Sequence, residues 1–264
     1  MPTTETAVSL RPLESPSDFE ACVVLQRATW GADFRELVPP ALLRIAQHTG
    51  GIAAGAFALP DRLLGFVFGI TGWRDRRPVH WSHMLAVAGD ARDRGIGRRL
   101  KLYQRDRLRD AGVDRMFWTF DPLVARNAHL NLNRLGATVR EYVEDMYGHN
   151  PMSRTDSVIG SDRFVVEWLL DANAPHPRVE PVDPDAPSIG LEAGTGAALP
   201  DAPVVRVEIP GDIQRLKVEA ADTALAWRRA TRRALQHYLA RGYAVRRLAR
   251  DAAGRGAYVL ARDT

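Results

Sequence analysis

The segment 84–109 constrains this chain more than any other part of its sequence. It reads MLAVAGDARDRGIGRRLKLYQRDRLR, an apolar run followed by the pattern Arg92-x-x-Gly95-x-Gly97 and then by a basic helix. Glycines let the backbone turn tightly and approach an anion, and the helix that follows offers unpaired N–H groups and a positive dipole end. This order predicts a loop that binds a pyrophosphate. An ordinary cap before a helix is the alternative that the residues leave open.

Composition restricts the class of protein. The 264 residues carry a formal net charge of +4 and give a sequence pI of about 9.6, which admits anionic cofactors, acidic metabolites or nucleic acid as partners. Cys22 is the single cysteine, so we expect neither an intrachain disulfide nor a metal site. A secretory leader pattern and a long apolar segment are both lacking. We therefore predict a cytoplasmic protein that does not enter a membrane.

Periodicity and turn residues predict alternating strands and helices up to residue 170. A hairpin turn is expected at Pro60–Arg62, and Gly112 and Gly136 are expected to end helices. The predicted strands cover residues 8–13, 50–59, 63–71, 79–87, 113–120, 138–147 and 163–170, and the predicted helices cover residues 19–26, 40–48, 97–111 and 127–135.

A change in composition marks one internal boundary. Residues 171–203 lose periodicity and are rich in Pro, Ala, Gly and Asp, which is typical of a linker. Residues 204–264 are then expected to form a small βαββ unit, and residues 1–170 the main domain. The order of helix, glycine and hairpin in this unit is similar to that of residues 127–148, which suggests a partial duplication.

Five strings in a fixed order carry a resemblance to a known family. The strand MLAV, the loop RDRGIG, the helix RRLKLYQRDRLRDAG, the strand MFWTFDP and the segment NAHLNLNRLGA resemble the GNAT N-acyltransferases. The resemblance covers residues 8–170, and WTFDPL is similar to an acetyltransferase-like branch with a C-terminal extension. It implies a mixed α+β fold with a splayed sheet flanked by helices, in which the strands 79–87 and 113–120 separate.

The resemblance also implies where acetyl-CoA or another short-chain acyl-CoA would bind as co-substrate. The pantetheine arm would pair with the backbone of one strand, and the loop amides would hold the pyrophosphate. Asn127 matches the family asparagine that touches the pantetheine arm. The strand positions are Leu85, Ala86 and Val87, and the loop positions are Arg92, Arg94, Gly95, Ile96, Gly97 and Arg98.

Transfer of an acyl group to an amine needs a base, and an acid can protonate the leaving thiolate. In many relatives a tyrosine is this acid, but Leu132 stands at the matching position. Either Tyr142 or Tyr147 replaces it from another strand, or the thiolate leaves unaided, as a thiol pKa of about 8.5 permits. His83 is the first candidate for the base, expected on one face with Leu85 and Val87.

Several of these residues have ordinary structural interpretations. A strand histidine is often satisfied by a neighbouring backbone group, and Asp121, the second candidate for the base or an anchor for the substrate ammonium, is equally suited to begin a turn. Arg228 and Arg232 lie in a predicted helix, where they could clamp a carboxylate. We favour the alternative, an exposed basic face with Leu225, Leu235, Tyr238 and Leu239 turned inward.

We predict an N-acyltransferase that moves an acetyl or other short acyl group, with succinyl among the candidates, to the amine of a small molecule or amino acid. A sensor that binds acyl-CoA in the same cleft without turnover is the alternative, because the tyrosine is missing. Nucleic-acid binding by the basic C-terminal helix is a third hypothesis, against which the acidic residues within 141–185 argue. A homodimer is kept as a prediction.

Overall fold

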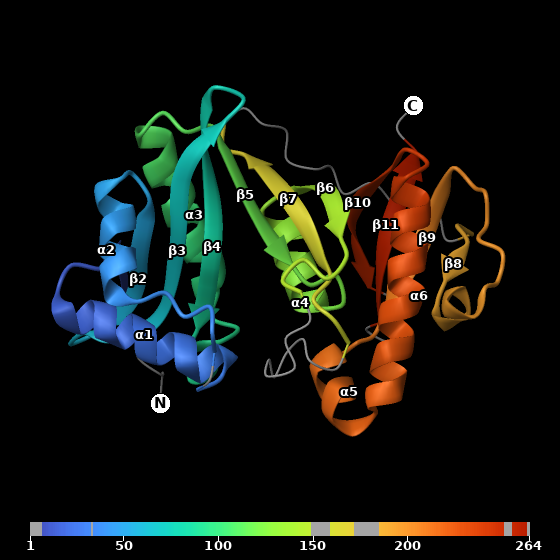
Figure 1. Cartoon of the computed structure of the whole chain (residues 1–264), viewed down its shortest axis with the longest axis horizontal. Coiled ribbons are helices and arrows are strands. Elements are labelled where there is room, and N and C mark those ends of the chain that lie inside the picture. Colours follow the sequence, from blue (N-terminus) through green and yellow to red (C-terminus); the bar gives the residue numbers. More distant parts are fainter. Residues whose placement is uncertain (1–6, 33, 149–158, 172–184, 251–254, 263–264) are drawn as a thin grey trace. The chain divides into compact units, whose positions relative to one another are not determined.

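The computed structural model describes residues 7–32, 34–148, 159–171, 185–250 and 255–262. The helices are α1 (Pro16–Trp30), α2 (Pro40–His48), α3 (Ile96–Asp110), α4 (Ala125–Ala128), α5 (Ile213–Glu219) and α6 (Ala221–Leu239) (Figure 1). The strands are β1 (Val8–Pro12), β2 (Ile52–Ala58), β3 (Arg62–Arg74), β4 (Arg77–Val87), β5 (Arg115–Phe120), β6 (Thr138–Val143), β7 (Arg163–Leu169), β8 (Ser188–Ile189), β9 (Val204–Ile209), β10 (Tyr243–Arg250) and β11 (Gly256–Arg262).

The strands form two sheets, with the orders β1-β2-β3-β4-β5-β7-β6 and β10-β11-β9-β8. The chain divides into two compact units. Unit 1 comprises residues 1–118 and 169–174, and unit 2 comprises residues 119–168 and 175–264. The predicted limits at residues 170 and 204 concern folding domains and stay a prediction. The predicted mixed α/β fold with a splayed sheet and an additional C-terminal sheet is confirmed.

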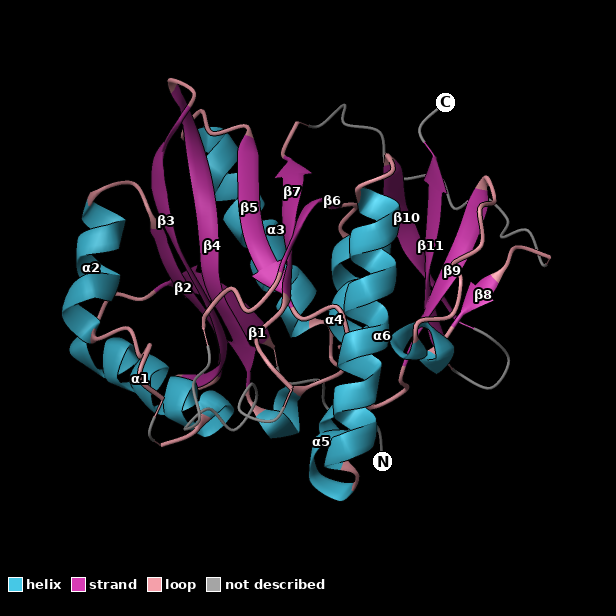
Figure 2. Ribbon diagram, turned by 45° about the vertical axis from the view of Figure 1, so that its right-hand side comes forward, coloured by secondary structure: helices cyan, strands magenta, loops and turns pink. Residues whose placement is uncertain are grey.

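Unit 1 is a sheet covered by helices on both faces, with α1 and α2 on one face and α3 on the other (Figure 2). Strands β1 to β4 are antiparallel neighbours, and β5 runs parallel to β4. Phe19 of α1 packs with Phe66 and Met84 of the sheet, whereas Ile96 and Leu100 of α3 pack on the opposite face. Alternation along the strands thus supplies two cores from one sheet.

Local signals explain where the first helix begins. The Ser15 side chain accepts a hydrogen bond from the Asp18 backbone N–H, and the Asp18 carboxylate accepts one from the Ser15 backbone N–H. Pro16 occupies the first turn, where its missing N–H costs nothing. These residues fix the start of α1 at Pro16.

Unit 2 contains the β6–β7 pair and the second sheet, on which α6 packs. The βαββ order expected for residues 204–264 is present as β9, α6, β10 and β11, with α5 inserted before α6. Strand β8 and a short 3₁₀ helix at Leu191–Thr195 lie within the residues predicted to be a linker. Backbone pairing with β9 accounts for β8 because two residues carry too weak a pattern to be recognised alone.

Three predicted element limits are wrong. The predicted strands end at residue 71 and begin again at residue 79, but β3 extends to Arg74 and β4 begins at Arg77. The two strands are joined by a tight turn at Asp75 and Arg76, which both adopt positive φ. The strand predicted to reach residue 147 ends at Val143 and gives way to turns. The helix predicted at 127–135 begins as α4 and continues as a π-helical turn over His129–Arg134.

Candidate functional site

The glycine loop ends in an uncapped helix N-terminus. Gly95 adopts φ +72° as the N-cap of α3, no side chain caps that end, and its first turn holds no acidic residue. The first backbone bond of the helix runs from the Arg99 N–H to the Gly95 carbonyl. Arg92, Arg94 and Arg98 are exposed around these N–H groups. The donors and charges of this end of α3 fit a phosphate group.

Strand β4 carries a β-bulge at His83. The register with β3 shifts there, because Phe68 pairs with Met84 while Gly69 pairs with Ser82. The prediction that His83 shares a face with Leu85 and Val87 is wrong. Leu85 and Val87 pack on the α3 side, whereas His83 contacts Phe68 of the opposite core, because the extra residue of a bulge breaks the alternation of the strand.

His83 keeps an exposed side chain at this bulge. Its ring meets the Phe68 ring edge to face, with centroids 6.1 Å apart. Desolvation by the surrounding protein lowers the pKa of His83, and the charge of Glu36 opposes this effect. The imidazole is therefore neutral and able to accept a proton near pH 7.

Strands β4 and β5 stop pairing shortly before this bulge along β4. They pair in parallel at His80 with Met116 and at Trp81 with Phe117. No further pair joins them in the part of the chain that the structure describes, although β4 continues to Val87. The backbone of Leu85, Ala86 and Val87 therefore has a strand neighbour on the β3 side alone.

In unit 2, Asp121 follows β5 and is buried. Its Oδ1 accepts a hydrogen bond from the Leu123 N–H at 2.9 Å, and its Oδ2 forms an ion pair with Arg228 Nη2 at 2.8 Å. Arg228 is 1% exposed and also donates from Nε to the Ile159 carbonyl, while its Nη1 has no hydrogen-bond partner among the described residues. Asp121 thus begins a turn and neutralises a buried arginine.

Tyr142 donates a hydrogen bond to Asp162, a fully buried carboxylate that also binds Arg232. Burial and the neighbouring charge of Asp162 raise the pKa of Tyr142 far above its usual value. Tyr147 lies in a turn, not on a strand as predicted. Its exposed hydroxyl is 2.9 Å from Thr119 Oγ1.

The π-helical turn holds Leu132, at the position of the family tyrosine, and Asn133 beside it. Leu132 is 2% exposed and belongs to the core, so it offers no acid. The Asn133 side chain donates to the Leu248 carbonyl at 2.8 Å and accepts from the Leu248 N–H at 3.0 Å, which ties this turn to β10. Asn127, in α4, is half-buried.

The predicted exposed basic face of α6 is wrong for two of its arginines. Arg228 is buried, and Arg232 binds Asp162, Glu144 and Asp145. The carboxylate clamp is also wrong for them, because protein carboxylates already occupy both guanidinium groups. Among the four apolar residues expected inside, Leu235 and Tyr238 are buried, and Leu225 and Leu239 are partly exposed. Periodicity could not reveal the acidic partners, which come from distant segments.

Unit 1 also contains a chain of buried polar side chains that the sequence patterns do not predict. Lys101 Nζ donates to Ser82 Oγ at 2.7 Å, Ser82 Oγ donates to Gln104 Oε1 at 2.8 Å, and Gln104 Nε2 lies 2.9 Å from His80 Nε2. His80 Nδ1 lies 3.0 Å from Thr71 Oγ1, which donates to a carbonyl. Since Gln104 Oε1 and the Gly50 carbonyl oxygen can only accept, the chain has one direction, and the His80 proton sits on Nδ1.

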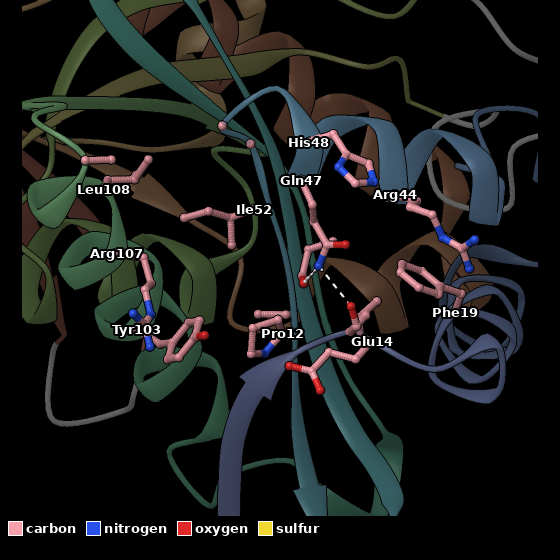
Figure 3. A pocket seen from close by; sticks show the side chains of 16 residues that line it. Pro12, Glu14, Phe19, Arg44, Gln47, His48, Ile52, Tyr103, Arg107 and Leu108 are labelled. Atoms are coloured by element: carbon pink, nitrogen blue, oxygen red, sulfur yellow. Dashed lines mark hydrogen bonds between the residues drawn. The ribbon is translucent and has the colours of Figure 1, made fainter.

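A cavity of about 700 Å³ opens on unit 1 near the C-terminal ends of α2 and α3 (Figure 3). Arg44 and Arg107 contribute guanidinium groups to its lining, and His48 contributes an imidazole. The Gln47 side chain crosses the cavity, and its Nε2 donates to the Leu13 carbonyl at 3.0 Å and to the Ala53 carbonyl at 2.8 Å. The predicted site residues do not line this cavity, so it is distinct from the glycine loop.

The described residues contain no group of His, Cys, Asp and Glu side chains that could hold a metal ion. Within the same residues, every helix is too short or too polar to cross a bilayer.

Known proteins resemble part of this chain. The acetyltransferase (GNAT) family matches residues 19–136. No curated protein matches the chain. Solved structures are similar to it at low identity: the NatC complex bound to Gag peptide and CoA (18% identity, 62% of this chain, 99% of that chain, TM-score 0.48), an acetyltransferase of the GNAT family from Streptococcus pneumoniae (16%, 62%, 100%, 0.49) and the ribosomal-protein-S18-alanine N-acetyltransferase from Escherichia coli (16%, 64%, 99%, 0.47).

The family match spans the bulged strand, the glycine loop and α3, which are the parts that carried the resemblance in the sequence. Residues 19–136 therefore match the acetyltransferase (GNAT) family, and this part of the chain carries a GNAT-type acetyltransferase domain.

Proposed function

We propose that this protein transfers an acetyl or other short acyl group from acyl-CoA to the amine of a small molecule or an amino acid. The N-terminus of α3 carries this proposal, because its free N–H groups, the left-handed Gly95 and the exposed arginines suit a pyrophosphate. In this proposal, Ile96, Gly97 and Arg98 donate from their backbones, and Arg92 and Arg94 add charge.

The pantetheine arm would lie along β4, whose residues Leu85, Ala86 and Val87 extend beyond the last pair with β5. Asn127 is kept as a further contact, on the family resemblance. The acyl-CoA supplies the thioester that the amine attacks. The chain's own part is to orient that thioester and to move protons.

His83 is the proposed base. Its pKa is lowered, so the imidazole is neutral at the pH of the reaction and accepts the amine proton directly or through water. Tyr147 is the proposed acid, since its hydroxyl is exposed. A CoA thiolate can also leave unaided, because a thiol pKa of about 8.5 makes it a good leaving group. The polar groups of Asp121 and Tyr142 already have strong partners within unit 2.

The second candidate is a sensor that binds acyl-CoA without turnover. The buried Leu132 and the bond of Tyr142 to Asp162 favour it, because both remove a tyrosine acid. Thiol release separates the two. With acetyl-, propionyl- and succinyl-CoA and a panel of amines and amino acids, the transferase releases CoA only when an acceptor is present. Tight binding of acyl-CoA with no release under any pair identifies the sensor.

A matched pair of glycine variants tests the phosphate site. Gly95 and Gly196 both adopt positive φ, at +72° and +88°, and a Cβ added at either residue would meet no atom within 4 Å. Gly95→Asp places a carboxylate at the proposed pyrophosphate site and is expected to weaken CoA binding about 10- to 100-fold, as the loss of one or two charge-assisted hydrogen bonds would. Gly196→Asp introduces similar backbone strain and is expected to leave the CoA dissociation constant unchanged in calorimetry. Equal effects of the two variants would refute the site.

A further inference from the structure

Lysine is scarce in this chain. Of 36 basic residues, two are lysines, Lys101 and Lys217, and the rest are arginines. Lys101 belongs to α3 and is 3% exposed. Its Nζ donates to Ser82 Oγ at 2.7 Å, lies 3.8 Å from Met116 Sδ and sits 4.0 Å from the centre of the Trp118 ring. A cationic side chain is thus buried among a hydroxyl, a thioether and an indole.

These contacts place Lys101 at the point where β4 and β5 part. The last parallel pair is Trp81 with Phe117, and Ser82 and Trp118 are the next residue of each strand. At about 3.3 Å per residue, β4 runs roughly 17 Å from Ser82 to Val87, close to the glycine loop. In the proposed binding mode along β4, a thioester that enters from the loop would bring its acyl end towards Lys101.

No carboxylate lies within ion-pair distance of Lys101 in the part of the chain that the structure describes. His80 is the titratable neighbour, and burial lowers its pKa to about 3, so it brings no charge. The remaining groups around Nζ are Ser82, Met116 and Trp118, and the Ser82 proton is already given to Gln104. The N–H groups of Lys101 thus face a hydroxyl, a thioether and an aromatic ring, and the described residues supply no charged acceptor among them.

Burial lowers the pKa of Lys101 well below its ordinary value of 10.5. A lysine can lose its proton in such a place, whereas an arginine cannot. A buried amine of this kind regains its proton when an anion arrives beside it, because an opposite charge favours the charged form.

We propose that Lys101 binds the terminal carboxylate of a dicarboxylic acyl group, of which succinyl is the representative, at the point where β4 and β5 separate. This inference rests on the proposed acyl-CoA function. The acyl carboxylate supplies the counter-ion that Lys101 lacks, and the thioester carbonyl stays nearer to the bulge at His83. Lys101 is a specificity residue in this arrangement and takes no part in proton transfer to the amine.

Succinyl-CoA and butyryl-CoA test the proposal, because they differ in a terminal carboxylate against a methyl group. Wild-type protein is expected to bind succinyl-CoA about 10- to 100-fold more tightly than butyryl-CoA, the ratio that one charge-assisted hydrogen bond provides. Lys101→Met is expected to abolish this ratio by weakening succinyl-CoA while butyryl-CoA binds as before or more tightly. Lys217→Met, which replaces the other buried lysine, is expected to preserve the ratio.

Proton uptake gives a second readout that a purely structural role would not move. Calorimetry at a fixed pH below 10.5, in two buffers of different ionisation enthalpy, is expected to show proton uptake with succinyl-CoA, and none with butyryl-CoA or with the Lys101→Met variant. Equal affinities and no proton uptake would overturn the inference and leave the acyl-CoA function standing. If free CoA and both thioesters fail to bind, the proposed function itself fails.

Discussion

The two units bury a cation in opposite ways. In unit 1, Lys101 is buried beside neutral groups and has a lowered pKa. In unit 2, Arg228 is buried beside Asp121, and the charges of Asp121 and Asp162 outweigh its desolvation and raise its pKa. Arg228 keeps its charge, whereas Lys101 can lose it.

This difference separates a structural polar core from one that can respond to a ligand. A buried ion pair is stabilised by its own partner, and breaking it leaves an uncompensated charge. A buried amine without an acid can become neutral, so its charge depends on what binds next to it. The comparison therefore predicts that unit 2 loses stability when its partners are removed, while unit 1 loses ligand discrimination.

The largest effect is expected from Asp121→Asn. The variant keeps an oxygen for the Leu123 N–H but removes the charge that faces Arg228, so the free energy of unfolding should fall by about 3–5 kcal/mol. Chemical denaturation followed by circular dichroism measures it. Asp201→Asn is the control, because Asp201 and Arg262 form a surface pair worth about 0–1 kcal/mol. Similar losses in the two variants would remove the contrast between the units.

A smaller loss is expected from Tyr142→Phe. Asp162 would lose the tyrosine hydroxyl but keep Arg232 and the Asp145 N–H, so unfolding should become easier by about 1.5–3 kcal/mol, the range for a bond to a charged group. Because a raised pKa makes Tyr142 a poor acid, kcat should change by less than about tenfold, against the roughly 10²-fold or more that loss of an acid gives. A collapse of kcat with unchanged stability would make Tyr142 the acid.

The sheets show a second contrast between the units. The order β4-β5-β7-β6 recurs as β8-β9-β11-β10, and β4–β5 and β8–β9 are both parallel. The partial duplication expected from the sequence stays a prediction. Along the sequence, the connection from β4 to β5 contains α3, whereas the connection from β8 to β9 contains only the 3₁₀ helix Leu191–Thr195. The second sheet thus lacks a counterpart of the helix N-terminus at which we propose phosphate binding.

Sequence reasoning succeeded where local chemistry decides the structure. Ser15 and Pro16 fix the start of α1, and Gly95 and Gly112 frame α3 with positive φ. It failed where distant segments decide. The bulge at His83 depends on the pairing of β3 with β4, and the burial of Arg228 depends on Asp121, which is far away in the chain. The scarcity of lysine was visible in the composition and could have directed attention to Lys101.

The smallest effect on stability is expected from Lys101→Met. Methionine fills similar apolar space and removes a group that is costly to bury, so the free energy of unfolding at pH 7 should stay within about 1 kcal/mol of wild type or rise. Its pH dependence is the sharper measurement. Between the lowered folded pKa of Lys101 and its ordinary value of 10.5, the unfolded chain binds more protons than the folded chain, so this lysine makes stability rise with pH.

Wild-type stability relative to Lys101→Met should therefore increase as the pH rises towards 10.5, and other titrating groups cancel in the difference. His80 does not interfere, because its pKa of about 3 keeps it neutral over this range. Denaturant titrations at several pH values give the slope. A difference that is flat with pH would mean that Lys101 stays charged when buried, and the contrast with Arg228 would then lie in the partner alone and not in the charge.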